Sequence, residues 1–173
     1  MRGALACVVA ASVLQAQAPD FSGTWRLDDA KSTIVATAGF VGLISAGVPK
    51  TLHITQPANG SVVIESQVNE AHVRIYKPGL ETSTPAGQGG TVTMTTKWSG
   101  QVLMSDGAMK APNGDTTSVR EAVSLSADRK ILTIEVTLSA GAAGKPSSST
   151  LVYSRITDVG GCETWPTPCK RSP

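Results

Sequence analysis

Short stretches of alternating apolar and polar residues, separated by turn residues, follow one another through most of the chain. Alternation with a period of two is typical of strands that bury one face, and turns this frequent favour hairpin-linked antiparallel strands. About ten strands are expected: 22–27, 50–56, 61–68, 71–76, 80–84, 91–98, 101–105, 116–126, 131–139 and 150–156.

The connections between these stretches are short, and most contain turn residues. Asn59-Gly60 is a hairpin signal, and Asp106-Gly107 and Asn113-Gly114 indicate turns within 106–114. Nearly every strand is therefore joined to its sequence neighbour. Closing such a meander removes exposed edges, so the sequence predicts an all-β fold, an antiparallel up-and-down β-barrel.

One segment, 28–48, interrupts the strand pattern. Ile34, Ala38 and Val41 have helical spacing, but three glycines in the same segment weaken a long helix. The segment is expected to form either two short helical turns or a glycine-rich flap after the first strand. It could lie on the barrel surface as a crossover or cover the mouth of a cavity.

The N-terminus has the pattern of a secretory signal. Arg2 precedes the apolar run 4–14, and the small and polar residues 15–18 follow it. A run of about 11 residues is too short to span a bilayer, so we expect a removed leader and no membrane span. The predicted organisation is a signal peptide at 1–18, a barrel domain at 19–157 and a C-terminal tail at 158–173, in a secreted or periplasmic protein.

Removing the leader also removes Cys7 and leaves two cysteines, Cys162 and Cys169. In an oxidising compartment an even number of cysteines favours pairing, so a disulfide between them is expected. A zinc site would need two more ligands, and none is nearby in the sequence.

The charge pattern and the motif content exclude several function classes. Only 16% of residues are charged, with 15 Lys and Arg against 13 Asp and Glu. The sequence has no cluster of basic residues of the kind that would indicate nucleic-acid binding. The sequence contains no Gly-x-Ser-x-Gly, His-Glu-x-x-His or P-loop motif. We expect no catalysis, no cofactor and no metal. His53 and His72 are interpreted as surface or polar-interior residues, although a haem or metal ligand is an alternative.

The segment Phe21-Ser22-Gly23-Thr24-Trp25-Arg26-Leu27 contains a Gly-x-Trp core. It resembles the first strand of the calycins, the superfamily of lipocalins and fatty-acid-binding proteins. The resemblance extends over 21–156 through Lys97-Trp98-Ser99-Gly100, Thr116-Thr117-Ser118-Val119-Arg120-Glu121 and Leu151-Val152-Tyr153-Ser154-Arg155. The opening phrase is also similar to that of secreted bacterial proteins of unassigned role.

The lipocalin resemblance implies a structural role for two residues. The first-strand Trp of that pattern plugs the base of the barrel, and a cationic residue of the last strand lies across its ring. The matching residues are Trp25 and Arg155. Such a cation–π contact contributes about 0.5 to 2 kcal/mol.

The fatty-acid-binding resemblance implies a carboxylate grip, which this chain matches only in part. The pattern has an Arg two positions before a Tyr on the final strand and a helper Arg on an earlier one. Tyr153 and Arg120 match the Tyr and the helper, but Leu151 stands where the principal Arg belongs. Charge compensation for a fatty acid is therefore reduced.

The strand 116–126 leaves the direction of Arg120 open. Val119, Val123 and Leu125 share one face, and Arg120 lies on the other. If the cavity is apolar, Arg120 points to water; if Arg120 points inward, the interior is mixed.

Together these features predict a monomeric, non-catalytic binding protein for a small hydrophobic or amphiphilic molecule. The polar candidates for orienting this ligand are Arg74, Tyr76, Arg120 and Tyr153. Two alternatives remain at this point. One is a haem-binding or isomerase-type enzyme on the same barrel, and the other is a structural or interaction module with a solid core.

Overall fold

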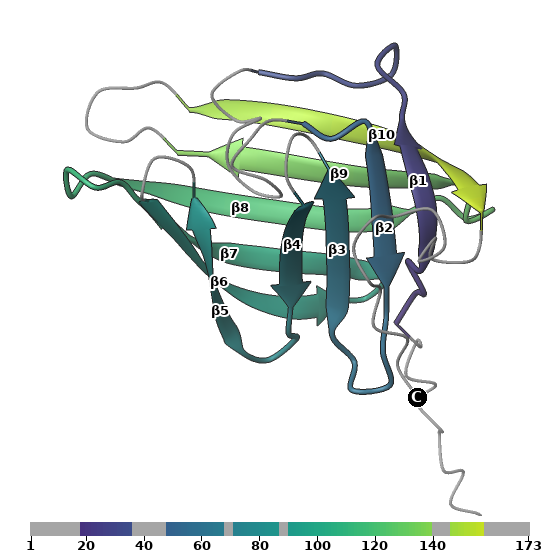
Figure 1. Ribbon diagram of the computed structural model, residues 1–173, viewed down its shortest axis with the longest axis horizontal. Helices are drawn as coiled ribbons and strands as arrows, with labels where there is room; N and C mark the ends of the chain where they lie inside the picture. The colour runs from purple at the N-terminus through teal and green to yellow at the C-terminus, as the bar shows by residue number, and fades with distance from the viewer. Residues whose placement is uncertain (1–17, 36–47, 68–70, 87–89, 140–145, 158–173) are drawn as a thin grey trace, which may run out of the picture.

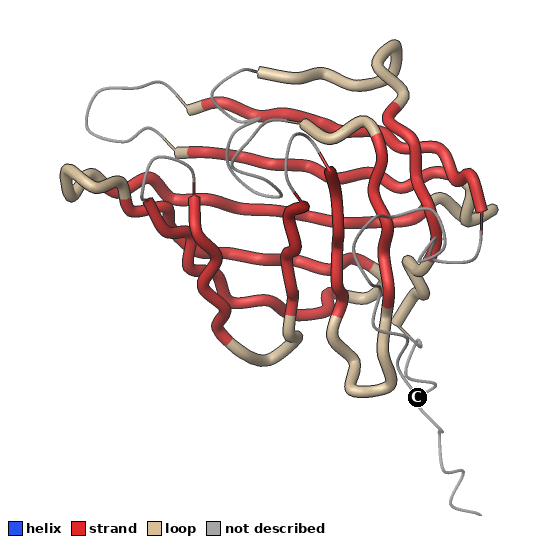
Figure 2. Tube along the Cα trace, in the orientation of Figure 1, coloured by secondary structure: helices blue, strands red, loops and turns tan. Residues whose placement is uncertain are grey.

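The computed structural model describes residues 18–35, 48–67, 71–86, 90–139 and 146–157. These residues form ten antiparallel strands and no helix (Figure 2). The strands are β1 (Gly23–Leu27), β2 (Thr51–Thr55), β3 (Val62–Gln67), β4 (Ala71–Tyr76), β5 (Glu81–Ala86), β6 (Gly90–Ser99), β7 (Val102–Lys110), β8 (Thr116–Leu125), β9 (Ile131–Leu138) and β10 (Ser147–Thr157).

The ten strands form one sheet in the order β4-β3-β2-β1-β10-β9-β8-β7-β6-β5. Every pairing but one joins sequence neighbours, and the exception, β1 with β10, brings Trp25 opposite Arg155. Strands β1 to β5 cross in front of strands β6 to β10, so the sheet wraps around an interior (Figure 1). This confirms the predicted up-and-down, calycin-like barrel.

The barrel is nearly closed. Strands β4 and β5 are consecutive in the chain but form the two ends of the sheet, and in the part of the chain that the structure describes they are not paired. A bridge between Pro78 and Thr96 lies near this opening. β4 is therefore paired with β3 alone, and side chains have to make its contacts across the opening.

One expectation from the sequence needs correction. Asp106-Gly107 is not a turn, because β7 runs straight through it to Lys110 and pairs with β6 and β8. In the described part of the crossover, 28–35, there is no helix, and Thr33 forms an antiparallel bridge with Thr150 of β10.

Gly107 is required because two backbones approach closely at this point. A Cβ added there would lie 2.0 Å from the Thr93 carbonyl oxygen and 2.7 Å from the Met94 Cα of β6. Glycine allows such an approach, so the residue that suggested a turn is instead a packing requirement inside a strand.

Substitution of Gly107 by Ala is expected to destabilise the protein by about 1 to 3 kcal/mol, because β6 must move to relieve the overlap. Denaturant unfolding measures the change. Gly100→Asn is the control: Gly100 has a φ of 60° and nothing within 4 Å of an added Cβ, and Asn tolerates that conformation. If both variants lose equally little stability, the close approach is absent in solution.

Inward-facing aliphatic side chains from nearly all strands form the core. Alternate residues of β9, Leu132, Ile134, Val136 and Leu138, are all buried, and Glu135 between them is exposed. This is the alternation expected of a sheet with one solvated face.

Trp25 lies in this core beneath Arg155. Its side chain is fully buried, its indole nitrogen donates to the carbonyl oxygen of Phe21 at 3.0 Å, and the Arg155 guanidinium lies 4.2 Å from the ring centroid. Gly23 has a φ of 142°, and an added Cβ would lie 2.6 Å from the Thr157 carbonyl oxygen. The Gly-x-Trp motif thus combines a buried core residue with a position where a side chain does not fit.

Several expectations fall on residues outside those described. They concern the leader up to residue 17, Cys7, the crossover at 36–47, and the tail with Cys162 and Cys169. Among the described residues, no helix has the length and apolar character that crossing a membrane requires.

Candidate functional site

In the second half of strand β4, the polar residues lie inside and the apolar residues lie outside. Arg74 and Tyr76 are 5% and 1% exposed, whereas Val73 and Ile75 are 49% and 40% exposed. The orientation follows from pairing with β3, where Ile64 and Val62, both buried, lie opposite Arg74 and Tyr76. An antiparallel strand with one solvated face normally buries its apolar side, so this reversal marks a special part of the interior.

Arg74 and Tyr76 both bind Glu121, which lies across the interior on β8. Arg74 Nη1 donates to Glu121 Oε1 at 3.1 Å, and Arg74 Nη2 lies 3.1 Å from Oε2. The Tyr76 hydroxyl donates to the same Oε2 at 3.0 Å. Glu121 is completely buried, so the three residues, which we call the interior cluster, form a bidentate ion pair reinforced by a phenol.

The cluster also connects the open edge of the sheet to the opposite wall. The Arg74 guanidinium lies 4.9 Å from the Tyr76 ring centroid and donates to the Met94 sulfur on β6. Strands β4, β6 and β8 thus meet through side chains near the place where β4 and β5 are unpaired.

Arg74 and Tyr76 each keep one protonation state at neutral pH. Burial is the largest single influence on Arg74 and opposes its charge, but Glu121 and Tyr76 together outweigh burial, and the pKa of Arg74 is raised. Burial raises the pKa of Tyr76 well above its ordinary value, although Arg74 acts in the opposite direction. At neutral pH the cluster therefore contains a guanidinium and a neutral phenol.

Hydroxyl groups supply further polarity on the inward face. Thr96 and Ser105, on β6 and β7, share a hydrogen bond of 2.8 Å and are buried. Ser66 on β3 is 1% exposed, and its hydroxyl has no hydrogen-bond partner. It lies two positions from Ile64, the residue opposite Arg74. Buried hydroxyls normally form a hydrogen bond. The Ser66 hydroxyl is therefore a polar group in the interior that is available to hydrogen-bond a ligand.

Tyr153 is separate from the interior cluster. Its hydroxyl donates to the Pro49 carbonyl oxygen at 3.0 Å, and its backbone pairs with Leu27 and Leu132. Burial raises the pKa of Tyr153, so this phenol is also neutral. In the structure it anchors the chain before β2.

Arg120 lies outside the barrel. Its side chain is 66% exposed and forms a surface ion pair with Asp106, at 2.6 Å between Nε and Oδ1. Since successive residues of a strand point to opposite faces, the buried Val119 and Val123 place Arg120 outward. This corrects its selection as a ligand-orienting residue.

The same strand parity places Glu121 inside the barrel, although it is not among the candidates selected from the sequence. Glu121 is an odd-numbered residue like Val119 and Val123 and shares their inward face. What the sequence did not reveal was its partner, because Arg74 is 47 residues earlier in the chain.

His53 lies on the outer face of β2 and is almost completely buried. Its Nδ1 and the Thr24 hydroxyl are 2.9 Å apart, and Glu65 of β3 is its cross-strand neighbour. Within the described ranges, no group of three or more His, Cys, Asp or Glu side chains is arranged to hold a metal ion.

Acidification is expected to destabilise the protein through His53. Burial lowers the pKa of His53 from 6.5 to about 4, so between these values the unfolded chain binds more protons and stability falls as the pH falls. Glu65, whose pKa burial raises above 4.5, acts in the opposite direction. His53→Gln should reduce the loss of Tm between pH 7 and pH 5. An unchanged loss would mean that His53 is solvated.

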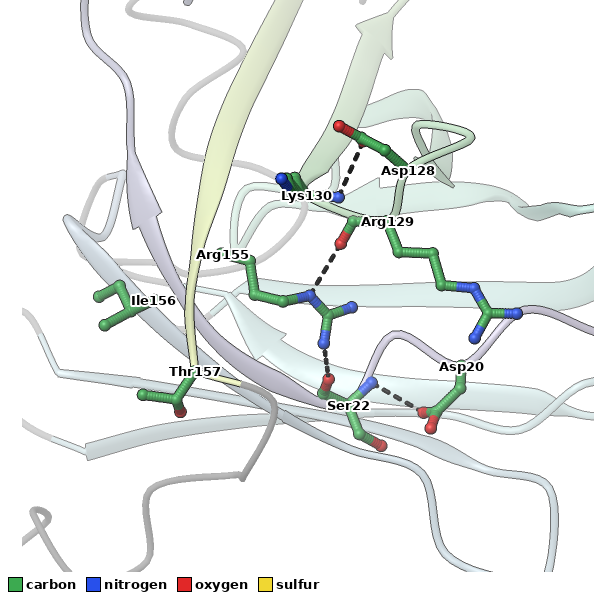
Figure 3. A pocket seen from close by; sticks show the side chains of 8 residues that line it. All are labelled: Asp20, Ser22, Asp128, Arg129, Lys130, Arg155, Ile156 and Thr157. Carbon is green, nitrogen blue, oxygen red and sulfur yellow. Dashed lines mark hydrogen bonds between the residues drawn. The ribbon is translucent and has the colours of Figure 1, made fainter.

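A surface pocket of about 620 Å³ lies at the end of the barrel where β10 ends (Figure 3). It is lined by Asp20, Ser22, Asp128, Arg129, Lys130, Arg155, Ile156 and Thr157. Arg155 donates to the carbonyl oxygens of Ser22 and Arg129, each at 2.8 Å. These contacts hold the end of β10 against the β8–β9 turn, and the pocket is distinct from the interior cluster.

Comparison with solved structures shows that the fold is similar to that of fatty-acid-binding proteins. The REP1-NXSQ fatty acid transporter has a TM-score of 0.55 and 16% identity over 79% of this chain and 96% of its own. Fatty-acid-binding protein 1 of Echinococcus granulosus has a TM-score of 0.54 and 15% identity over 79% and 97%.

Lipid binding protein 8 of Caenorhabditis elegans gives similar values, with a TM-score of 0.52 and 12% identity over 78% and 94%. No family model matches the sequence, and no curated protein matches it. At these identities the likeness concerns the fold.

Proposed function

We propose that this protein binds a small hydrophobic or amphiphilic molecule inside the barrel and performs no chemistry on it. The observation that carries the proposal is the reversal of β4, which turns Arg74 and Tyr76 into an interior otherwise lined largely by aliphatic residues. An apolar interior with a few convergent polar groups is the usual composition of a ligand site. The fold, which the fatty-acid transporter and binding proteins share, supports the same function.

Binding would be driven by burial of apolar ligand surface, at about 25 cal/mol per Å² removed from water. The interior cluster and the inward hydroxyls of Ser66, Thr96 and Ser105 would orient the polar end of the ligand. We also propose that the protein works outside the cytoplasm, a proposal that rests on the leader pattern of the N-terminal residues.

Purified protein, freed of lipid by denaturation on a reversed-phase column and refolded, is expected to bind the uncharged fluorescent probe N-phenyl-1-naphthylamine. One site per chain and a micromolar dissociation constant are expected. Tyr76→Phe, which removes one inward hydroxyl, should change the affinity at least about threefold, because the remaining cluster rearranges. Arg120→Gln, on the outer face, should leave it unchanged.

Native mass spectrometry of the protein before delipidation provides a second measurement and should detect a co-purifying lipid. Absence of any co-purifying molecule, together with no saturable probe binding, would contradict the proposal and favour a solid core.

A further inference from the structure

We propose that the interior site selects an uncharged amphiphile, such as a long-chain alcohol or a monoacylglycerol, over a fatty-acid anion. This inference rests on the proposed function and specifies its ligand. It follows from the interior cluster, because Glu121 already occupies the guanidinium of Arg74.

The buried ion pair of the interior is already balanced. Among the described residues, Arg74 and Glu121 form the ion pair whose side chains are both buried, and its two charges sum to zero. A fatty-acid carboxylate in the same interior would add a second negative charge beside Glu121. Two carboxylates that share a buried site repel each other, and one of them must take up a proton or remain in water.

The guanidinium of Arg74 is already occupied by a carboxylate. Both terminal nitrogens of Arg74 lie 3.1 Å from Glu121, one on each carboxylate oxygen, so the fork that would hold a ligand carboxylate is filled. The Tyr76 hydroxyl donates to the same carboxylate. A fatty acid would have to displace Glu121, leaving its carboxylate buried without a counterion.

The hydrogen-bonding groups that remain available in the interior are hydroxyls. The Ser66 hydroxyl is buried and has no partner. In the Thr96–Ser105 pair, one hydroxyl donates to the other, and the acceptor keeps its own hydrogen to offer. Neutral hydroxyls bind an alcohol or ester head group without transferring charge into the interior. The inward polar groups therefore match an uncharged head group.

The experiment compares ligands of equal chain length: dodecanoate, dodecanol and 1-monododecanoylglycerol. Each displaces N-phenyl-1-naphthylamine from delipidated protein at pH 7.5. For the wild type, at least one of the neutral ligands is expected to bind at least about tenfold more tightly than dodecanoate.

Glu121→Gln is expected to improve dodecanoate binding at least about tenfold, because Arg74 loses its internal counterion and becomes available. The matched control is Glu135→Gln, which makes the same charge change on the exposed face of β9 and should leave all affinities unchanged.

The outcomes separate this inference from the proposed function. If the wild type binds dodecanoate as tightly as it binds both neutral ligands, the inference is overturned and the binding function remains. The same conclusion follows if Glu121→Gln does not increase the affinity for dodecanoate. If the probe binds neither protein and no ligand copurifies, both fail. The wild-type comparison decides the matter even if the variant does not fold.

Discussion

Replacing Arg74 with Met is expected to destabilise the barrel by about 3 to 5 kcal/mol, the largest effect of any single substitution in the interior cluster. The methionine leaves Glu121 fully buried without its counterion and removes the connection from β4 to β8. Denaturant unfolding at pH 7.5 measures the loss.

The double variant Arg74→Met/Glu121→Leu separates a missing contact from an orphaned charge. Replacing both members of a buried pair by apolar residues is often close to neutral, so the double variant should recover most of the lost stability. Arg120→Met is the surface control, since its ion pair with Asp106 is exposed and should contribute less than about 1 kcal/mol. A loss below about 1 kcal/mol for Arg74→Met itself would show that the pair is hydrated in solution.

Replacing Trp25 with Ala is expected to destabilise the protein by about 3 to 5 kcal/mol, comparable to the Arg74 effect. The indole is fully buried, donates to Phe21 and lies under Arg155, so its loss leaves a cavity and removes two specific contacts at the end of the barrel. Thermal and denaturant unfolding both measure this change.

A double-mutant cycle separates the ring contact from the packing. Trp25→Leu, Arg155→Met and the double variant should give a coupling energy of about 0.5 to 2 kcal/mol, the range for a cation over an aromatic face. Trp98→Ala is the matched control, because Trp98 is only partly buried and should lose less stability than Trp25. Equal losses would mean that Trp25 does not plug the core.

The sequence predicted the fold because strand periodicity and turn residues are local. The ten strands, the pairing of the first with the last and the contact between Trp25 and Arg155 all follow from alternation and from the Gly-x-Trp resemblance. Asp106-Gly107 misled the interpretation, because a glycine required for close strand packing looks the same as a turn glycine.

The interior cluster was less predictable. Arg74 and Tyr76 were selected, but Glu121 was not, and Arg120 was selected although it lies outside. On β4, periodicity alone places Val73 and Ile75 inward; only the register with β3 reverses this, and register depends on pairing between strands. Tyr153 matches the tyrosine of the fatty-acid-binding pattern in sequence, but in the structure its hydroxyl donates to the carbonyl oxygen of Pro49.

Binding of the ligand inside the barrel beside Arg74 can be tested by NMR of protein with ¹³C-labelled methionine methyl groups. Met94 contacts Arg74 inside the barrel, whereas Met104 lies on the outer face of β7. Titration with 1-monododecanoylglycerol should shift the Met94 methyl resonance with the dissociation constant found by probe displacement and leave Met104 unchanged. A saturable shift at Met104 with none at Met94 would place the ligand outside the barrel and contradict the account.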